Sequence, residues 1–128
     1  TKMKNAFVVG LALLSLAAMK SAAHPHDWYG KRRDPVYSAS TCCGGTDCAP
    51  LPEHAMTMTP DGLRVSLTLL EAQRINPRRV EPFDALIPFD RIQVSEDGKP
   101  HICLMPMDLK PSGDRRQGFY CIFLPPNT

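Results

Sequence analysis

The sequence lacks the motifs of the common catalytic sites. It contains no G-x-S-x-G elbow, no H-E-x-x-H zinc motif and no glycine-rich phosphate loop. Its acidic residues are scattered, and no spacing pairs two carboxylates for acid–base work. A nucleophilic pair such as Cys48 with His101 would depend on the fold alone, and disulfide formation would compete for that thiol. We therefore predict that the protein is not an enzyme.

The sequence also lacks an apolar run of the roughly 20 residues that a membrane-spanning helix needs. Two lysines precede its longest run, residues 7–19, and Lys20 closes it. The small residues at 21–23 then supply a cleavage site after Ala23. This pattern is typical of a secretory signal peptide. We predict that residues 1–23 are removed, that the protein is periplasmic or secreted, and that no membrane attachment remains.

The predicted exported chain lacks a surplus of either charge. The whole sequence has 15 basic and 13 acidic residues, a net charge of +2 with histidines neutral. Three lysines belong to the signal segment, so 12 basic residues face 13 acidic ones after cleavage, and the net charge becomes −1. Proteins that bind nucleic acid usually present a strongly basic face. We therefore predict no nucleic-acid partner. The partner would be an unidentified envelope protein or a small ligand.

Five cysteines remain in the exported part: Cys42, Cys43, Cys48, Cys103 and Cys121. An oxidising compartment favours disulfides, and a small domain gains most from them. A bridge from the 42–48 cluster to a later cysteine would close a loop of roughly 50 or more residues, worth about 4 kcal/mol in the chain-entropy treatment. Spacing does not give the connectivity. Because five is odd, two bridges leave one cysteine over, so a covalent dimer and a redox-active thiol stay open as alternatives.

The cysteine cluster lacks the spacing of metal and redox motifs. CCGGTDC (42–48) contains no C-x-x-C pair. The two glycines within it and the proline after it favour an irregular loop. A bridge between the adjacent Cys42 and Cys43 would strain the peptide bond between them, so we expect them to point to different partners. Structural disulfides are our main prediction for the cluster.

Thirteen prolines and eight glycines exclude long helices. Residues 24–53 show no periodicity and predict a long, irregular, cysteine-containing leader. Residues 54–128 are predicted to form a small β domain, which begins with a hairpin at 54–68 that turns at Pro60-Asp61-Gly62.

The rest of the β domain alternates short strands with turns. Thr68 and Glu71 fit a capping box and predict a short helix to Ile75. Residues 76–86 are expected to be a loop, and further strands are expected at 87–94, 100–107 and 118–124. The fold class is therefore mainly β: a small antiparallel sheet or partly open barrel with one short helix, held by disulfides.

Two predicted strands carry soft metal ligands on one face, where imidazole, thiolate and thioether groups would suit copper(I). Cleavage after Ala23 would also make His24 the N-terminal residue. An alternative prediction is therefore a periplasmic copper-binding protein that uses His24, His54, Met56, Met58 and His101. The stronger interpretation is that the methionines are ordinary core residues, which face Leu63, Val65 and Leu67 across the hairpin. Our main prediction is that the protein has no cofactor.

The leader contains an aromatic pair, Trp28-Tyr29. Exposed aromatic side chains are favoured contact residues, so the pair is a candidate partner surface. The same side chains are apolar enough to fold back on the core. Our first hypothesis is a non-enzymatic domain that binds a partner or supports an envelope assembly.

The order of the motifs resembles a known family. A signal peptide, then HDWY (26–29), CCGGTDC (42–48), EDGKPHIC (96–103) and CIFLPP (121–126) resembles a family of small secreted alphaproteobacterial proteins. The resemblance covers most of the exported chain, although the segment at 69–90 is longer than is usual there. It implies export and the cysteine framework CC-x4-C, D-G-x2-H-x-C and C-x-F-x-P-P. It implies no activity.

Overall fold

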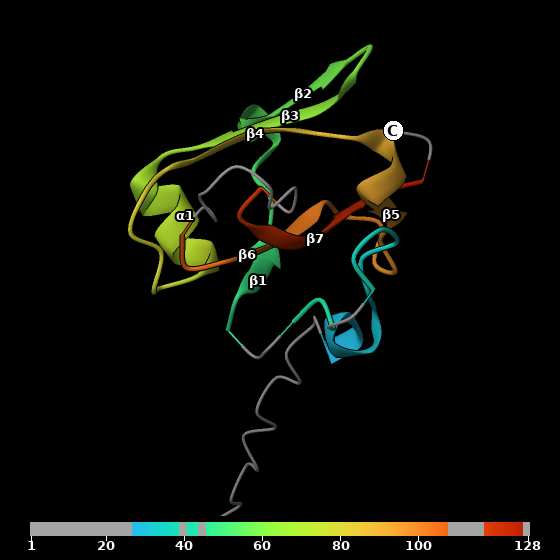
Figure 1. The fold of residues 1–128 in the computed structure, drawn as a ribbon, viewed down its shortest axis with the longest axis horizontal. Coiled ribbons are helices and arrows are strands. Elements are labelled where there is room, and N and C mark those ends of the chain that lie inside the picture. Colours follow the sequence, from blue (N-terminus) through green and yellow to red (C-terminus); the bar gives the residue numbers. More distant parts are fainter. Residues whose placement is uncertain (1–26, 39–40, 44–45, 108–116, 127–128) are drawn as a thin grey trace, which may run out of the picture.

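The computed structural model describes residues 27–38, 41–43, 46–107 and 117–126 (Figure 1). Within these ranges seven strands form two sheets, with one α-helix, α1 (Leu69–Ile75). The four-stranded sheet has the order β1 (Cys48–Pro50), β6 (His101–Leu104), β7 (Phe119–Leu124), β5 (Ile92–Val94). The three-stranded sheet has the order β2 (Met56–Thr59), β3 (Gly62–Leu67), β4 (Phe83–Ile87). The short 3-10 turns are η1 (Asp27–Lys31), η2 (Glu53–Ala55) and η3 (Phe89–Arg91).

The prediction of a mainly β fold with one short helix is confirmed. All neighbouring strands of the two sheets pair antiparallel except β5 and β7, which are parallel. No helix in the described ranges is long and apolar enough to cross a membrane. The predicted signal peptide, residues 1–23, lies outside the described residues.

The two local predictions around β3 are also confirmed. In the hairpin of β2 and β3, Met56 lies opposite Val65 and Met58 lies opposite Leu63. At the start of α1, the Thr68 side chain accepts a hydrogen bond from the Glu71 amide, and the Glu71 carboxylate accepts one from the Thr68 amide. This reciprocal capping box satisfies two amides that the helix leaves without partners.

The prediction of a loop over the whole of 76–86 is wrong, because Phe83–Ile87 forms strand β4. β4 pairs with β3 along its whole length, and this pairing buries Phe83 and Ile87. The single strand expected at 87–94 is wrong too, because Pro88 ends the pairing and the turn η3 separates β4 from β5. Proline has no amide hydrogen to donate to a strand ladder.

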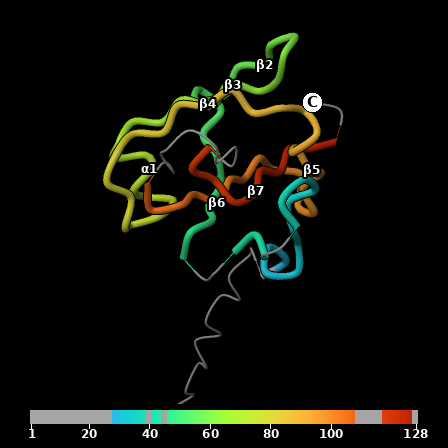
Figure 2. Tube along the Cα trace, in the orientation of Figure 1, coloured from blue at the N-terminus to red at the C-terminus, as the bar shows by residue number. Residues whose placement is uncertain are grey.

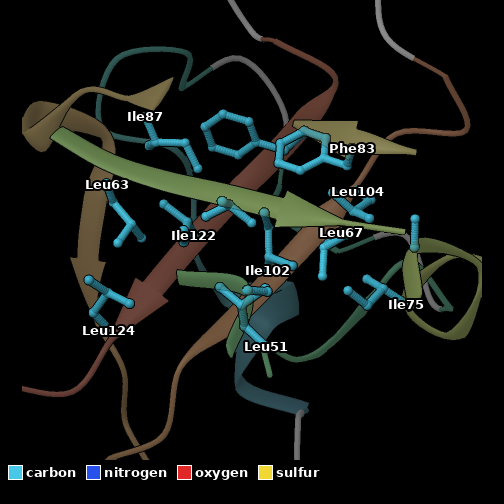
Figure 3. Packing of buried hydrophobic residues seen from close by; sticks show 14 residues of the cluster. Leu51, Leu63, Leu67, Ile75, Phe83, Ile87, Ile102, Leu104, Ile122 and Leu124 are labelled. Carbon is cyan, nitrogen blue, oxygen red and sulfur yellow. The ribbon is translucent and has the colours of Figure 1, made fainter. Parts of the chain in front are cut away.

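The main core lies between the two sheets (Figures 1 and 3). Inward side chains of β3 and β4 pack against those of β6 and β7, and the buried face of α1 closes one end. Strand alternation supplies every second residue to this core. Its members include Leu63, Val65, Leu67, Ala72, Ile75, Phe83, Ile87, Ile102, Leu104, Phe119, Ile122 and Leu124.

A second, smaller core covers the opposite face of β6 and β7. It contains Tyr29 and Cys42 from the N-terminal segment together with Cys103, Cys121 and Phe123 from the strands. The four-stranded sheet is therefore the middle layer of three, as the tube view also shows (Figure 2). Because both of its faces are covered, all four residues of β6 are buried. The segment expected as a leader thus contributes both β1 and an outer layer.

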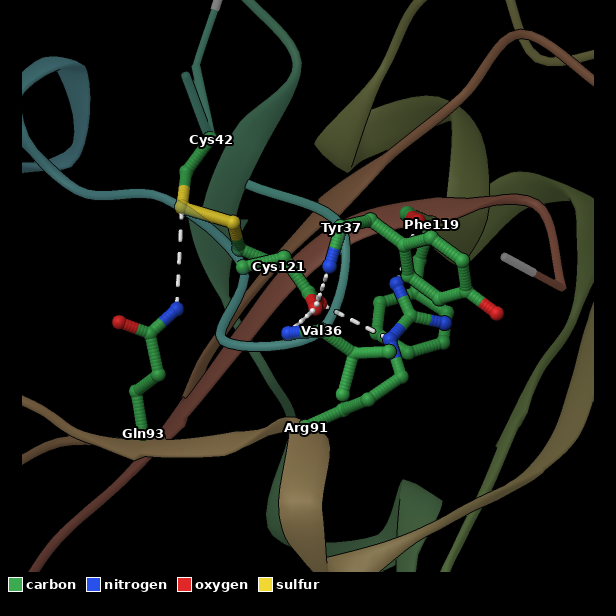
Figure 4. Close-up of polar contacts among 8 residues, drawn as sticks. Val36, Tyr37, Cys42, Arg91, Gln93, Phe119 and Cys121 are labelled. Atoms are coloured by element: carbon green, nitrogen blue, oxygen red, sulfur yellow. Dashed lines mark hydrogen bonds and ion pairs between the residues drawn. A yellow bond between two sulfur atoms is a disulfide. The ribbon is translucent and has the colours of Figure 1, made fainter. Parts of the chain in front are cut away.

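A buried ion pair between Asp34 and Arg91 connects the N-terminal segment to the turn η3 (Figure 4). Arg91 and Asp34 are each 2% exposed, and Arg91 Nε donates to Asp34 Oδ2 at 2.8 Å. The Arg91 guanidinium lies 3.7 Å from the centre of the Phe119 ring and donates to the Phe119 carbonyl. Asp34 Oδ1 accepts the amides of Val36 and Tyr37. Both charges therefore have hydrogen-bond partners, which a buried pair requires.

Candidate functional site

Two disulfides connect the N-terminal cysteine cluster to the central strands. Cys42 bonds to Cys121, 79 residues away, and Cys48 bonds to Cys103, 55 residues away (Figure 4 shows the first). The prediction of two long-range bridges with one cysteine over is confirmed. Cys42 and Cys43 are not bridged to each other, and Cys42 alone of the two takes part in a disulfide. Cys103 and Cys121 lie directly opposite each other in β6 and β7, yet they are not bonded to each other. Cys121 is bridged to Cys42 in the outer layer, and Cys103 to Cys48 in β1 of the same sheet.

The fifth cysteine, Cys43, keeps its thiol and is half-buried. Its Sγ donates to Asp47 Oδ1 at 3.1 Å, and the Sγ of Cys48 lies 3.8 Å from the same oxygen. These three atoms all lie within 4.8 Å of one another. The structure thus places a thiol, a carboxylate and one sulfur of a disulfide in a single cluster.

A hydrogen-bonded chain runs from Asp97 at the surface through the buried His101 to Tyr29 in the second core. Nε2 of the fully buried His101 lies 2.7 and 2.8 Å from the two Asp97 carboxylate oxygens and donates to them. Nδ1 then accepts a hydrogen bond from the Tyr29 hydroxyl. Burial, and then the charges of Asp97 and Cys43, raise the pKa of Tyr29 well above its usual range. Tyr29 therefore stays protonated and acts as the donor.

The prediction that Tyr29 forms part of a partner surface is wrong, whereas the prediction for Trp28 stays a prediction. Tyr29 is 1% exposed and packs in the second core, so an external partner does not reach it. Trp28 is half-buried, and its ring lies edge-on to Phe123 with 4.7 Å between the ring centres. Aromatic rings are large apolar surfaces, and this small domain uses the pair to cover its central sheet.

The structure does not bring the predicted copper ligands together. His54 bonds to the Glu71 carboxylate in a surface pocket beside α1, while Met58 lines a different groove. Met56 packs against the main core, and both ring nitrogens of His101 are engaged. His24 lies outside the described residues. In the described part, three or more His, Cys, Asp or Glu side chains gather at metal-binding distance only at Cys43, Asp47 and Cys48, and Cys48 is already bonded to Cys103.

An apolar groove of about 380 Å³ opens where the two sheets meet. Three large apolar side chains rise from it into solvent: Met58 is 46% exposed, Phe89 51% and Val94 57%. Its lining carries no charge, and its one polar side chain is Gln93. The lining residues are Met58, Phe89, Ile92, Gln93, Val94, Leu124, Pro125 and Pro126.

Sequence analysis missed Asp47, Asp97 and this groove. Asp47 stands next to Cys48, and Asp97 stands four residues before His101, so the signals were local but ambiguous. The groove combines β2, η3, β5 and the end of β7, and no local pattern contains all four. No protein-family model, curated protein or solved structure matches the chain.

Proposed function

We propose that this protein is an exported, disulfide-stabilised, non-enzymatic binding domain that holds an apolar segment of another envelope protein in the groove beside β5. The observation that carries the proposal is the gathering of Met58, Phe89 and Val94 around one uncharged groove. Contiguous exposed apolar patches with such a shape mark interaction sites. The predicted signal peptide and the resemblance to secreted alphaproteobacterial proteins support the envelope location.

The shape of the groove favours a protein over a small molecule. A small-molecule site buries most of its ligand. Here the apolar walls are themselves about half exposed, so a compact ligand would stay largely in water. Apolar side chains on a larger partner surface would cover the walls and fill the groove together. Because the lining is uncharged, the complementary segment is apolar and uncharged.

The partner segment binds through side chains and does not add a strand. β5 is an edge strand of the four-stranded sheet, and its Val94 carbonyl accepts a hydrogen bond from Arg32 at 3.2 Å. Arg32 also contacts Gln93 and Glu96, so one guanidinium covers this edge. Covered edges resist pairing with other chains.

The test places a photo-crosslinking residue at Phe89, with Val80 as the matched control. Val80 is 65% exposed and lies outside the groove. In cells, the Phe89 position should capture one envelope protein that the Val80 position does not. The captured protein, once purified, should bind the wild-type domain, and Phe89→Asp should weaken this affinity at least about ten-fold while Val80→Asp leaves it unchanged.

Three outcomes would overturn the proposal. Phe89 capturing only a second copy of this chain would make the groove a self-association surface. Equal affinity of the purified partner for wild type and Phe89→Asp would remove the groove from the interface. Absence of any crosslinked protein in the envelope would show that the groove has no protein occupant.

A further inference from the structure

The cluster around Asp47 contains a thiol and one sulfur of a disulfide. The Cys43 thiol and the Cys48 sulfur contact the same carboxylate oxygen, at 3.1 and 3.8 Å, and the Cys48 sulfur belongs to the disulfide with Cys103. A thiol and a disulfide sulfur within 4.8 Å of each other are the two reactants of thiol–disulfide exchange.

We propose that Cys43 exchanges with the Cys48–Cys103 disulfide, so that the domain has a second covalent form with a Cys43–Cys48 bond. The Cys43 proton passes to the Asp47 carboxylate, and the thiolate attacks Cys48 Sγ. The Cys43–Cys48 bond forms as the Cys48–Cys103 bond breaks, and the leaving sulfur of Cys103 takes the proton. One thiol and one disulfide stand on each side, so no external oxidant or reductant is needed.

The identity of the attacked sulfur follows from the positions of the three sulfurs. Cys48 lies at the surface-facing end of the bridge and is partly exposed, whereas Cys103 is fully buried in β6. The Cys43 thiol donates a hydrogen bond to Asp47, the residue immediately before Cys48. Attack at Cys48 releases Cys103, whereas attack at Cys42 of the other disulfide would require a bond between the adjacent Cys42 and Cys43.

The exchange removes a covalent link within the four-stranded sheet and leaves the outer layer attached. Cys48 and Cys103 are cross-strand partners of β1 and β6, so exchange removes the covalent link within this strand pair. The Cys42–Cys121 bridge still holds the outer layer to β7. The released Cys103 thiol lies opposite Cys121 in the sheet, inside the second core. The Cys43–Cys48 form is therefore a local switch in β1, independent of the proposed binding groove.

Tryptic mapping distinguishes the two forms, because lysines and arginines separate Cys103 from the cluster but none lies between Cys42 and Cys48. Purified oxidised protein is held at a series of pH values, quenched in acid, unfolded and then labelled with a maleimide. In wild type, the peptide that contains Cys103 should separate from the cluster peptide and carry the label. The initial rate should rise about ten-fold per pH unit while the thiol is mostly protonated, because the thiolate is the nucleophile.

The control is Cys43→Ser, which should leave the Cys103 peptide fully linked and unlabelled at every pH. A second variant, Cys103→Ser, tests whether the sulfurs of Cys43 and Cys48 can come close enough to form a disulfide. Under oxidised glutathione it should form a Cys43–Cys48 bridge and show no thiol to the maleimide. Label confined to Cys43 in wild type, at every pH, would overturn the exchange. Two labelled thiols in folded, oxidised Cys103→Ser would overturn the geometry on which it rests.

Discussion

Asp34 offers the sharpest test of how the N-terminal layer is held. Asp34→Ala removes the carboxylate that pairs with the buried Arg91 and leaves that guanidinium at 2% exposure. The bond from Arg91 to the Phe119 carbonyl, at 3.2 Å, does not replace the lost negative charge. Removing one member of a buried ion pair typically costs about 3–5 kcal/mol, because the other charge stays desolvated. We expect a loss of this size in the free energy of unfolding.

Two companion variants separate charge from burial. Asp34→Asn keeps an oxygen for the amides of Val36 and Tyr37 but loses the charge, so we expect a smaller loss of about 1–3 kcal/mol. Asp84→Ala breaks the pair of Arg64 with Asp84, which has a shorter distance, 2.6 Å, but is exposed on both sides. Exposed pairs contribute little, so this control should cost less than about 1 kcal/mol.

The assay is urea unfolding with both disulfides intact, followed by Trp28 fluorescence and extrapolated linearly to water. The Cys42–Cys121 bridge keeps the segment attached, so the measured loss reports the ion pair and not dissociation of the layer. A small domain has only about 5–15 kcal/mol of stability in total, so the expected loss is easily resolved. Losses for Asp34→Ala and Asp84→Ala within about 1 kcal/mol of each other would refute the assignment of a buried, structural pair.

Two further predictions concern a glycine and a tyrosine. Gly62 has φ +150°, and a Cβ there would collide with the Ile87 carbonyl oxygen, so Gly62→Ala should lower the free energy of unfolding by at least about 1–3 kcal/mol. Gly30→Ala, where a Cβ meets nothing within 4 Å, is the control in the same urea assay, and equal losses would contradict the argument. Tyr29→Phe leaves His101 Nδ1 buried without its donor and should cost about 1–3 kcal/mol at neutral pH. Because the folded state raises the Tyr29 pKa, the unfolded chain loses that proton first above about pH 10, so the difference from wild type should shrink there; a difference that stays constant from pH 7 to above pH 10 would contradict it.

The parts of the fold that sequence analysis predicted correctly depend on neighbouring residues. The capping box of Thr68 and Glu71 places α1 because both hydrogen bonds close within one helical turn. The turn at Pro60-Asp61-Gly62 sets the register of the hairpin, so its facing pairs follow from alternation. β4 was missed because its flanking prolines resemble loop signals, and only the pairing with β3 makes the segment a strand.

In the candidate site too, some features follow from the sequence and others depend on tertiary contacts. Composition predicted disulfides and one remaining thiol, but the sequence contains nothing that distinguishes Cys43 from its neighbour as the residue that keeps it. His101 meets Tyr29 across 72 positions of the chain, and the groove combines four separate elements. Such contacts depend on which layers pack against each other, and the distance between residues along the chain does not predict that.

The sequence by itself determined the local elements around β3, the mainly β class and the need for long-range disulfides, because turn geometry, caps and composition act over a few residues or over the whole chain at once. The tertiary structure alone decided that β6 and β7 form a middle layer covered on both faces. That burial explains the apolar run at 119–124, the bridge from Cys121 to the outer layer, and the enclosure of Tyr29 and His101. The physical reason is that these contacts come from packing three layers together, and packing selects partners by shape and burial rather than by distance along the chain.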